Sequence, residues 1–394
     1  MQEEKILEYA KAIEEKLIII RRDLHAHPEL GLEEYRTSGI IATYLQELGL
    51  EVTRGIGKTG VVALLRGKME GKTILLRADM DCLKLEEKNH IEYKSINKGY
   101  MHACGHDVHV SWLLGAAMIL SKFKEEIKGN VKFVFQPAEE FSAGAELMIA
   151  EGVLENPKVD AAIGAHIWPF VEAGKIAVKS GAIMASTDMF KIEVCGEGGH
   201  GAHPNKCIDP LVAATEIFTA LQTIVSRRLD PLEPAVVTVG KFNSGTAYNI
   251  IPDKAYLEGT IRTINNETRE KVPLIMEEII KGITLANGAS YKFEYQQFHP
   301  PVTNDKNMTE LLKASTEKLF GEDSFLKVER PAMTGEDFSF FQQKVPGVFF
   351  WVGNGSEEKC TNVPLHSPNF QADETAIARA AALFANCALE YLLT

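Results

Sequence analysis

Hydrophobic residues recur near the start of the chain at intervals that fit a helix. Ile6, Ile13, Leu17, Ile20 and Leu24 lie three, four or seven positions apart, which places them along one face of a helix. We therefore predict an amphipathic helix over residues 2–24 that caps the first domain.

Short apolar runs then alternate with helical stretches. Strands that are apolar on both faces and alternate with helices are typical of an α/β sheet covered on both sides. The predicted strands are residues 60–65, 73–77, 131–135, 159–165 and 347–352, and the helices include 110–123 and 143–151.

The order of elements changes in the middle of the chain. Predicted strands at 189–195, 235–242, 255–264 and 290–298 and helices at 210–228 and 267–287 follow one another as β-α-β-β-α-β, the ferredoxin-like pattern. Strand 347–352 and a helix at 373–393 then return to the earlier pattern of apolar strands alternating with helices. We therefore predict a small domain of residues 181–299, with boundaries near Lys179 and Pro301, inserted in a larger one formed by residues 1–180 and 300–394.

Composition and charge exclude several classes of protein. The 394 residues predict two or three domains at roughly 150 residues each. A net charge of −12 and the lack of a basic patch argue against nucleic-acid partners. The apolar run Leu17–Ile20 is too short for a signal peptide or a membrane span. Six cysteines without CxxC pairs fit reduced thiols, so we expect a cytoplasmic protein without a membrane partner.

Metal-binding side chains follow three predicted strands. Asp79 and Asp81 come after strand 73–77, Glu139 and Glu140 after strand 131–135, and His166 directly after strand 159–165. Ligands of open α/β sheets bind beyond the carboxyl ends of the strands. We therefore expect these groups to converge.

The segment His102–His109 holds a thiol and three imidazoles. Gly105 lets the backbone turn so that Cys104 and His106 point to one place. Sulfur, nitrogen and oxygen donors together suit zinc or another divalent metal such as manganese, cobalt or nickel. His366, on a Pro-bounded loop, adds an imidazole. For His102 and His109, structural and ligand-orienting roles are equally favoured, and structural roles are favoured for His25, His27, His90, His203 and His299.

Two adjacent carboxylates can divide the work of hydrolysis. One ligates a metal ion, and the other takes a proton from the activated water. The alternative for Glu139 and Glu140 is a solvated pair at a helix start, where the helix dipole favours acidic groups.

Six motifs, in order along essentially the whole chain, resemble the M20 metallopeptidase family. The resemblance is closest to its amidohydrolase branch, which holds hippurate hydrolases, N-acetyldiaminopimelate deacetylases and plant indole-acetyl-amino-acid hydrolases. The motifs are Arg22–Leu30, Arg77–Asp81, Met101–Asp107, Gln136–Glu140, Gly164–His166 and Pro364–Pro368.

The resemblance implies an aminopeptidase-like α/β domain that holds two metal ions, and an inserted lid that forms a homodimer. It implies that Cys104 bridges the ions, with His106 and His166 completing one site and Glu140 and His366 the other. Glu139 is then the general base, and Asp81 lies behind a metal ligand and orients it. Asp79 stands where other members of the wider family have a His ligand, and His106 compensates for that loss.

In the lid, the resemblance makes His200 the group that polarises the scissile carbonyl, often in the partner subunit's active site. It also assigns substrate-binding roles to Asn249 and to Arg262, whose guanidinium suits a substrate carboxylate; for Arg262, a surface ion pair on an edge strand is equally favoured. The chain departs from the branch at Cys82–Lys84, where Ala-Leu-Pro is usual. Asp337 either lines the site or caps a helix start.

The predicted function is hydrolysis of the amide bond of N-acyl-L-amino acids by a metal-activated water, with two ions of manganese, zinc, cobalt or nickel. Three alternatives stay open: a dipeptidase or carboxypeptidase on the same scaffold, a metal-independent thiol hydrolase that uses Cys104 as nucleophile, and a non-catalytic binding protein.

Overall fold

The computed structural model describes residues 2–393, which fold into two compact units. Unit 1 holds the chain up to Ile183, Thr303–Arg330 and the chain from Asp337 onward. Unit 2 holds Met184–Val302 and Pro331–Glu336.

Unit 1 is built on an eight-stranded sheet in the order β1-β2-β4-β3-β5-β16-β6-β15. Its centre is parallel, because β3 pairs with β4 and β5, and β5 pairs with β16. The outer strands are mixed: β1, β2 and β6 run antiparallel to a neighbour. The bounds are β1 Glu51–Ile56, β2 Gly60–Arg66, β3 Met69–Asp79, β4 Lys128–Gln136, β5 Ala161–Glu172, β6 Ile176–Val178, β15 Phe325–Lys327 and β16 Gly347–Gly355.

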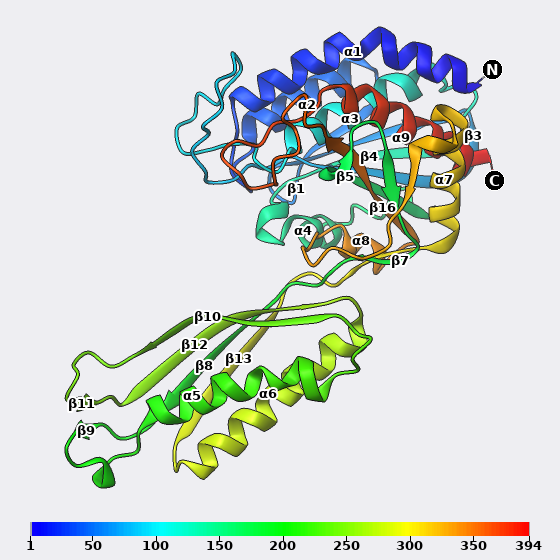
Figure 1. Cartoon of the computed structure of the whole chain (residues 1–394). Helices are drawn as coiled ribbons and strands as arrows, with labels where there is room; N and C mark the ends of the chain where they lie inside the picture. Colours follow the sequence, from blue (N-terminus) through cyan, green and yellow to red (C-terminus); the bar gives the residue numbers. More distant parts are fainter. Residues whose placement is uncertain (1, 394) are drawn as a thin grey trace. The chain divides into compact units, whose positions relative to one another are not determined.

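Helices cover both faces of this sheet (Figure 1), which confirms the predicted α/β class. Neighbouring residues of β16 show the two faces: Phe350 packs on Phe384 of α9, whereas Phe349 packs on Phe338 beside α8. The helices are α1 Gln2–Ala26, α2 Tyr35–Glu47, α3 His106–Lys122, α4 Gly144–Ala150, α7 Lys306–Phe320, α8 Ser339–Gln342 and α9 Thr375–Leu393.

Helix α9 is the one helix among residues 2–393 that is long and apolar enough to cross a membrane. It contacts α1, α3 and α7, and 78% of its apolar window is buried in the unit. This burial is typical of a core helix.

Unit 2 has a four-stranded antiparallel sheet in the order β10-β12-β8-β13. Buried residues alternate along β8 and β12, so one face of the sheet packs against α5 and α6 in a core of its own. The bounds are β8 Asp188–Cys195, α5 Pro210–Leu221, β10 Ala235–Ser244, β12 Lys254–Thr263, α6 Asn266–Ala286 and β13 Ser290–Gln297. The ferredoxin-like order is confirmed.

Two local predictions are wrong in detail. The helix predicted over 210–228 ends at Leu221, and a separate π-helical turn spans Ile224–Arg228. Residues Pro331–Glu336 were predicted in the first domain but group with unit 2. The backbone N–H of Ala185 donates to the carbonyl oxygens of Ala332 and Thr334, which joins this segment to the inserted unit.

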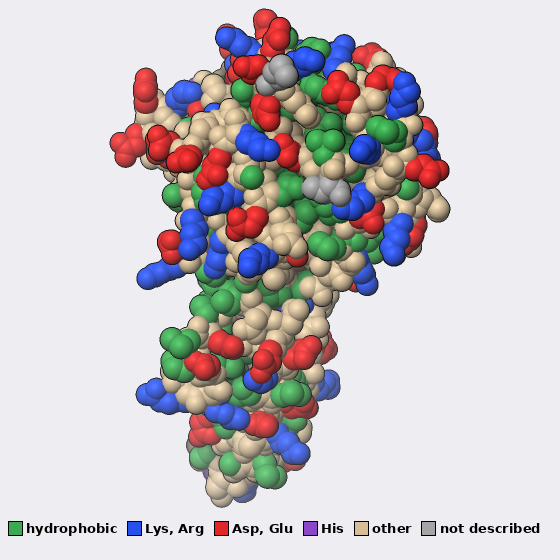
Figure 2. Space-filling view, turned by 90° about the vertical axis from the view of Figure 1, so that its right-hand side faces the viewer, with side chains coloured by type: hydrophobic (Ala, Val, Ile, Leu, Met, Phe, Trp, Pro, Cys, Tyr) green, Lys and Arg blue, Asp and Glu red, His purple; other side chains and the backbone are tan. Residues whose placement is uncertain are grey.

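Charged side chains of both signs lie on the face of the molecule that Figure 2 shows. On the face in Figure 2, acidic and basic residues are interspersed, and no basic patch is visible there.

Candidate metal centre

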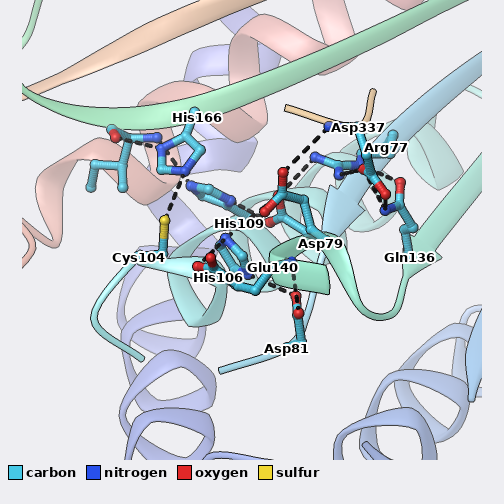
Figure 3. Close-up of polar contacts among 12 residues, drawn as sticks. Arg77, Asp79, Asp81, Cys104, His106, His109, Gln136, Glu140, His166 and Asp337 are labelled. Carbon is cyan, nitrogen blue, oxygen red and sulfur yellow. Dashed lines mark hydrogen bonds and ion pairs between the residues drawn. The ribbon is translucent and has the colours of Figure 1, made fainter. Parts of the chain in front are cut away.

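Several side chains that carry the predicted chemistry of unit 1 lie together at the carboxyl ends of the central strands (Figure 3). They include Asp79, Asp81, Cys104, His106, Glu140 and His166. Asp79 ends β3, and Glu139 and Glu140 follow β4 in the 3₁₀ turn Glu139–Phe141. The prediction that His166 follows its strand is wrong: it lies within β5, opposite Trp351 of β16. It lies just beyond Gly164, where the pairing of β3 with β5 ends. Its side chain therefore still reaches the carboxyl end of β3.

The five predicted metal ligands form two overlapping groups. Ligand atoms of Cys104, His106 and His166 lie within 4.8 Å of one another, and so do those of Cys104, Glu140 and His366. The Sγ atom of Cys104 lies 3.3 Å from Nε2 of His166, and Nε2 of His366 lies 3.3 Å from Oε1 of Glu140. Cys104 belongs to both groups, which is the arrangement expected of a bridging thiolate.

A glycine makes the tight turn between the first two ligands. Gly105 has φ +84° and caps α3, which begins at His106. A Cβ atom at Gly105 would lie 2.6 Å from Cγ2 of Ile167. Both the backbone conformation and the close approach therefore require glycine.

Asp81 holds one ligand and the turn that carries another. Its Oδ1 lies 3.0 Å from Nδ1 of His106, and its Oδ2 accepts the backbone N–H of Glu140 at 3.1 Å. The Nε2 atom of His106 is buried without a hydrogen-bond partner among the described residues. An imidazole held by a carboxylate, with its other nitrogen unsatisfied, fits a metal ligand.

His109 supports the ligands instead of joining them. Its Nε2 accepts the backbone N–H of Ile167 at 3.0 Å, so its proton is on Nδ1, which donates to Asp79 at 2.5 Å. Arg77 donates to the other oxygen of Asp79 at 2.7 Å. The open question about His109 is thus resolved in favour of positioning the backbone beside His166.

His102 is excluded from both groups. Its ring is buried, and neither nitrogen has a hydrogen-bond partner among residues 2–393. Burial lowers the pKa of His102 to about 3, so its ring is neutral at physiological pH.

The electrostatics of the cluster fit cations. Burial raises the pKa of the Cys104 thiol, and the carboxylates of Glu140 and Glu139 raise it further. Burial also keeps the pKa of His166 well below its usual range, so His166 is a neutral donor. A buried thiol among carboxylates ionises when a metal ion binds beside it. Sulfur, nitrogen and oxygen donors in one cluster suit divalent transition metals.

Glu139 and Glu140 are not a solvated surface pair. The side chain of Glu140 is only 9% exposed. The backbone N–H of Asp337 donates to Oε1 of Glu139 at 3.3 Å, and one carboxylate oxygen of Glu139 lies within 4.8 Å of ligand atoms of His106 and Glu140. Glu139 is therefore beside the ligands and held in place, as a general base requires.

Asp337 is buried behind Glu139. It accepts hydrogen bonds from Arg77 at 2.9 Å, from Gln136 at 2.7 Å and from the backbone N–H of Ala145 at 3.0 Å. It therefore satisfies an N–H in the first turn of α4 and does not cap a helix start of its own. Arg77 and Gln136 stand in the motifs quoted above, but their pairing with Asp337 has no local signal in the sequence.

The predicted lid residues lie in unit 2 and fall into two places. His200 is exposed, and its Nδ1 accepts the N–H of Ala202 at 3.0 Å. It pairs with Ile250, beside Asn249, in the small β9–β11 ribbon (Gly199–His200 and Ile250–Ile251). Arg262 lies at the other end of β12, a central strand and not an edge strand, where its guanidinium donates to Thr187. The alternative of a surface ion pair on an edge strand is therefore wrong.

Comparisons with known proteins identify the family of this chain. The profile of peptidase family M20/M25/M40 matches residues 75–390. An N-acetylcysteine deacetylase of Bacillus subtilis is 41% identical over 386 residues, covering 98% of this chain and 99% of that protein. Thermostable carboxypeptidase 2 of Saccharolobus solfataricus is 41% identical over 392 residues, 98% of each.

A solved structure of a dinuclear metal-binding peptidase of the M20 family from Bacillus subtilis is similar throughout. It has a TM-score of 0.86 and 37% identity, and the match covers 98% of this chain and 99% of that one. The chain therefore belongs to peptidase family M20/M25/M40, as a member of its amidohydrolase branch that hydrolyses amide bonds.

Proposed function

We propose that the protein cleaves N-acyl-L-amino acids into a carboxylic acid and a free amino acid. The observation that carries this proposal is the position of Glu139, which lies beside the two groups of ligands. Cys104, His106, His166, Glu140 and His366 would hold two divalent ions of manganese, zinc, cobalt or nickel. When bound, these ions acidify water and polarise the acyl carbonyl.

The protein's own groups move the protons and hold the substrate. Glu139 takes a proton from the attacking water and passes it to the leaving amine. His200 donates to the oxygen that becomes negative as the water attacks, and Arg262 forms a forked ion pair with the substrate carboxylate. Asn249 binds the substrate next to His200.

We propose further that the protein is a homodimer joined through unit 2. The outer face of α5 exposes Leu211, Val212 and Phe218, and the ring of Phe218 lies 6.3 Å from that of Phe242 on β10. Strand β10 is the edge of its sheet. An apolar patch beside an unpaired edge is typical of a contact surface. The mass in solution should be twice 43.5 kDa.

The positions of the lid residues support the same assembly. The linkers to unit 1 adjoin Asp188 and Gln297, which pair at the Arg262 end of the sheet. His200 and Asn249 lie beyond the opposite end of β12, roughly 25 Å away along the strand at about 3.3 Å per residue. We propose that His200 and Asn249, at the end of the sheet away from the linkers, serve the partner subunit's site.

The general base is tested by Glu139→Gln. The variant should bind as much metal as the wild type and lose at least about 100-fold in kcat, since general base catalysis contributes about 10² to 10⁴. Glu125→Gln, on the surface, is the matched control and should keep full activity. Full activity of Glu139→Gln would reject the mechanism.

The alternatives predict different results. The raised pKa of Cys104 disfavours a thiol nucleophile, so removal of metal by a chelator should abolish activity, and manganese, cobalt, nickel or zinc should restore it. A thiol hydrolase would survive the chelator.

The likeness to a carboxypeptidase keeps a peptidase reaction as the second candidate. Rates on N-acetyl and N-benzoyl amino acids compared with those on dipeptides distinguish the two reactions.

A further inference from the structure

A buried glutamate outside the ligand set supports the turn that carries Glu139. Glu34, just before α2, is 0% exposed. Its Oε1 accepts the backbone N–H of Ala138 at 3.0 Å, and its Oε2 accepts the hydroxyl of Thr59 at 2.5 Å. Ala138 directly precedes Glu139, so a carboxylate from a segment about one hundred residues earlier fixes the backbone beside the proposed general base.

The turn itself has an unusual backbone that needs such support. Ala138 and Ser142 both have φ +53°, and they flank the 3₁₀ turn Glu139–Phe141. Left-handed backbone is unfavourable at a residue other than glycine and persists only where the surroundings impose it. Glu34 provides the acceptor for the N–H of one of these two residues.

The segment Glu29–Glu34 contacts two neighbouring parts of the site. A Cβ atom at Gly31 would lie 2.9 Å from Cα of Ala138 and from the ring of Phe141, so the segment touches the turn directly. At its other end, the carbonyl oxygen of Glu29 accepts the N–H of Cys82 at 2.9 Å, next to Asp81. The segment therefore bridges the loop of Asp81 and the turn of Glu139.

We propose that Glu34 is a positioning residue for the general base, acting through the N–H of Ala138. The proposal rests on the role of Glu139 proposed above. Misplacement of a reacting group by about 1 Å lowers rates by about 100-fold. Loss of the Glu34 acceptor should therefore lower kcat while the metal ligands and the substrate-binding groups stay in place.

Three variants test this role. Glu34→Ala should lower kcat by about 10- to 100-fold, with KM and the bound metal per chain unchanged. Glu34→Gln should restore kcat to within a few-fold of the wild type, because its amide oxygen accepts the N–H of Ala138 and its amide N–H donates to Thr59. Thr59→Val removes only the second hydrogen bond and should leave kcat near that of the wild type.

A destabilised variant elsewhere separates positioning from stability. Leu312→Ala opens a cavity under α7. This helix packs on β6, β15 and β16, at the side of the sheet opposite to Thr59. It should lower Tm at least as much as Glu34→Ala does, yet keep kcat at a temperature where both are folded. Loss of kcat in Glu34→Gln equal to that in Glu34→Ala, or loss of metal in Glu34→Ala, would overturn the proposal.

The two proposals fail in different ways. If Glu139→Gln is inactive but Glu34→Ala has wild-type kcat, only the role of Glu34 is rejected. If Glu139→Gln is active, the assigned base is rejected, whatever Glu34→Ala shows.

Discussion

Among single residues, His299 of unit 2 shows how burial, with the nearby charges of Arg262 and Arg269, sets a charge state. Its side chain is 3% exposed, and its ring packs against Gly335, where a Cβ atom would come within 1.9 Å of it. Burial lowers the pKa of His299 to about 4. The ring is therefore neutral at physiological pH.

This low pKa predicts acid sensitivity of unit 2. Between pH 6.5 and pH 4, the unfolded chain binds a proton at this residue that the folded chain does not bind, so stability falls as pH falls through this range. The free energy of unfolding should fall by on the order of 3 kcal/mol over the full range. Tm measured from pH 7 to pH 4.5 should fall less in His299→Gln than in the wild type. Equal falls would contradict the prediction.

The sequence allowed prediction of the residues that are chemically suited to bind metal. Cys104 and His106 stand beside Gly105, so their convergence was predictable from local spacing. The residues that support these ligands were not predictable, because their hydrogen-bond partners are distant in the chain. Arg77 pairs with Asp337 across 260 residues, and Glu34 pairs with Ala138 across 104 residues. Such pairs leave no local pattern, and only the fold brings them together.

Among the elements, helix α6 offers a test of backbone entropy. Gly282 is exposed and lies within the helix, four residues before its last residue Ala286, and a Cβ atom there would meet nothing within 4 Å. Gly282→Ala should therefore stabilise the protein by about 0.5 to 1 kcal/mol in urea unfolding.

The end of the same helix provides the matched control. Gly288 has φ +68°, where an alanine is strained, so Gly288→Ala should destabilise the protein by about 1 kcal/mol. The prediction for Gly282 fails if Gly282→Ala lowers the free energy of unfolding as Gly288→Ala does.

Strands were predictable where both faces are buried. The apolar runs of β3, β4, β5 and β16 identified the centre of the sheet, whereas β1 is largely exposed and β6 and β15 have three residues each. Such strands lack the alternation or the length that sequence patterns detect. The end of α5 at Leu221 was missed because no Gly or Pro follows before Leu229.

At the scale of the whole molecule, the inserted domain was predictable because its β-α-β-β-α-β order differs from the order on either side. The return of Pro331–Glu336 to unit 2 was not, because six residues of irregular backbone carry no periodic pattern. Their membership depends on hydrogen bonds to Ala185 that only the folded chain reveals.

The proposed dimer makes a quantitative prediction for mixed variants. Glu139→Gln and His200→Ala should each be nearly inactive alone. When the two are unfolded together and refolded, half of the dimers are mixed, and one site in each mixed dimer has both intact residues, which gives roughly a quarter of wild-type activity. No recovery, although mixed dimers form, would show that His200 does not serve the partner's site.

The length of the unit 2 sheet has a kinetic consequence. If His200 and Asn249 complete the site of another chain, an isolated chain can retain its metal ions and still have no activity. Specific activity would then decline on dilution, as pairs separate, and recover on concentration without any change in the fold of either chain.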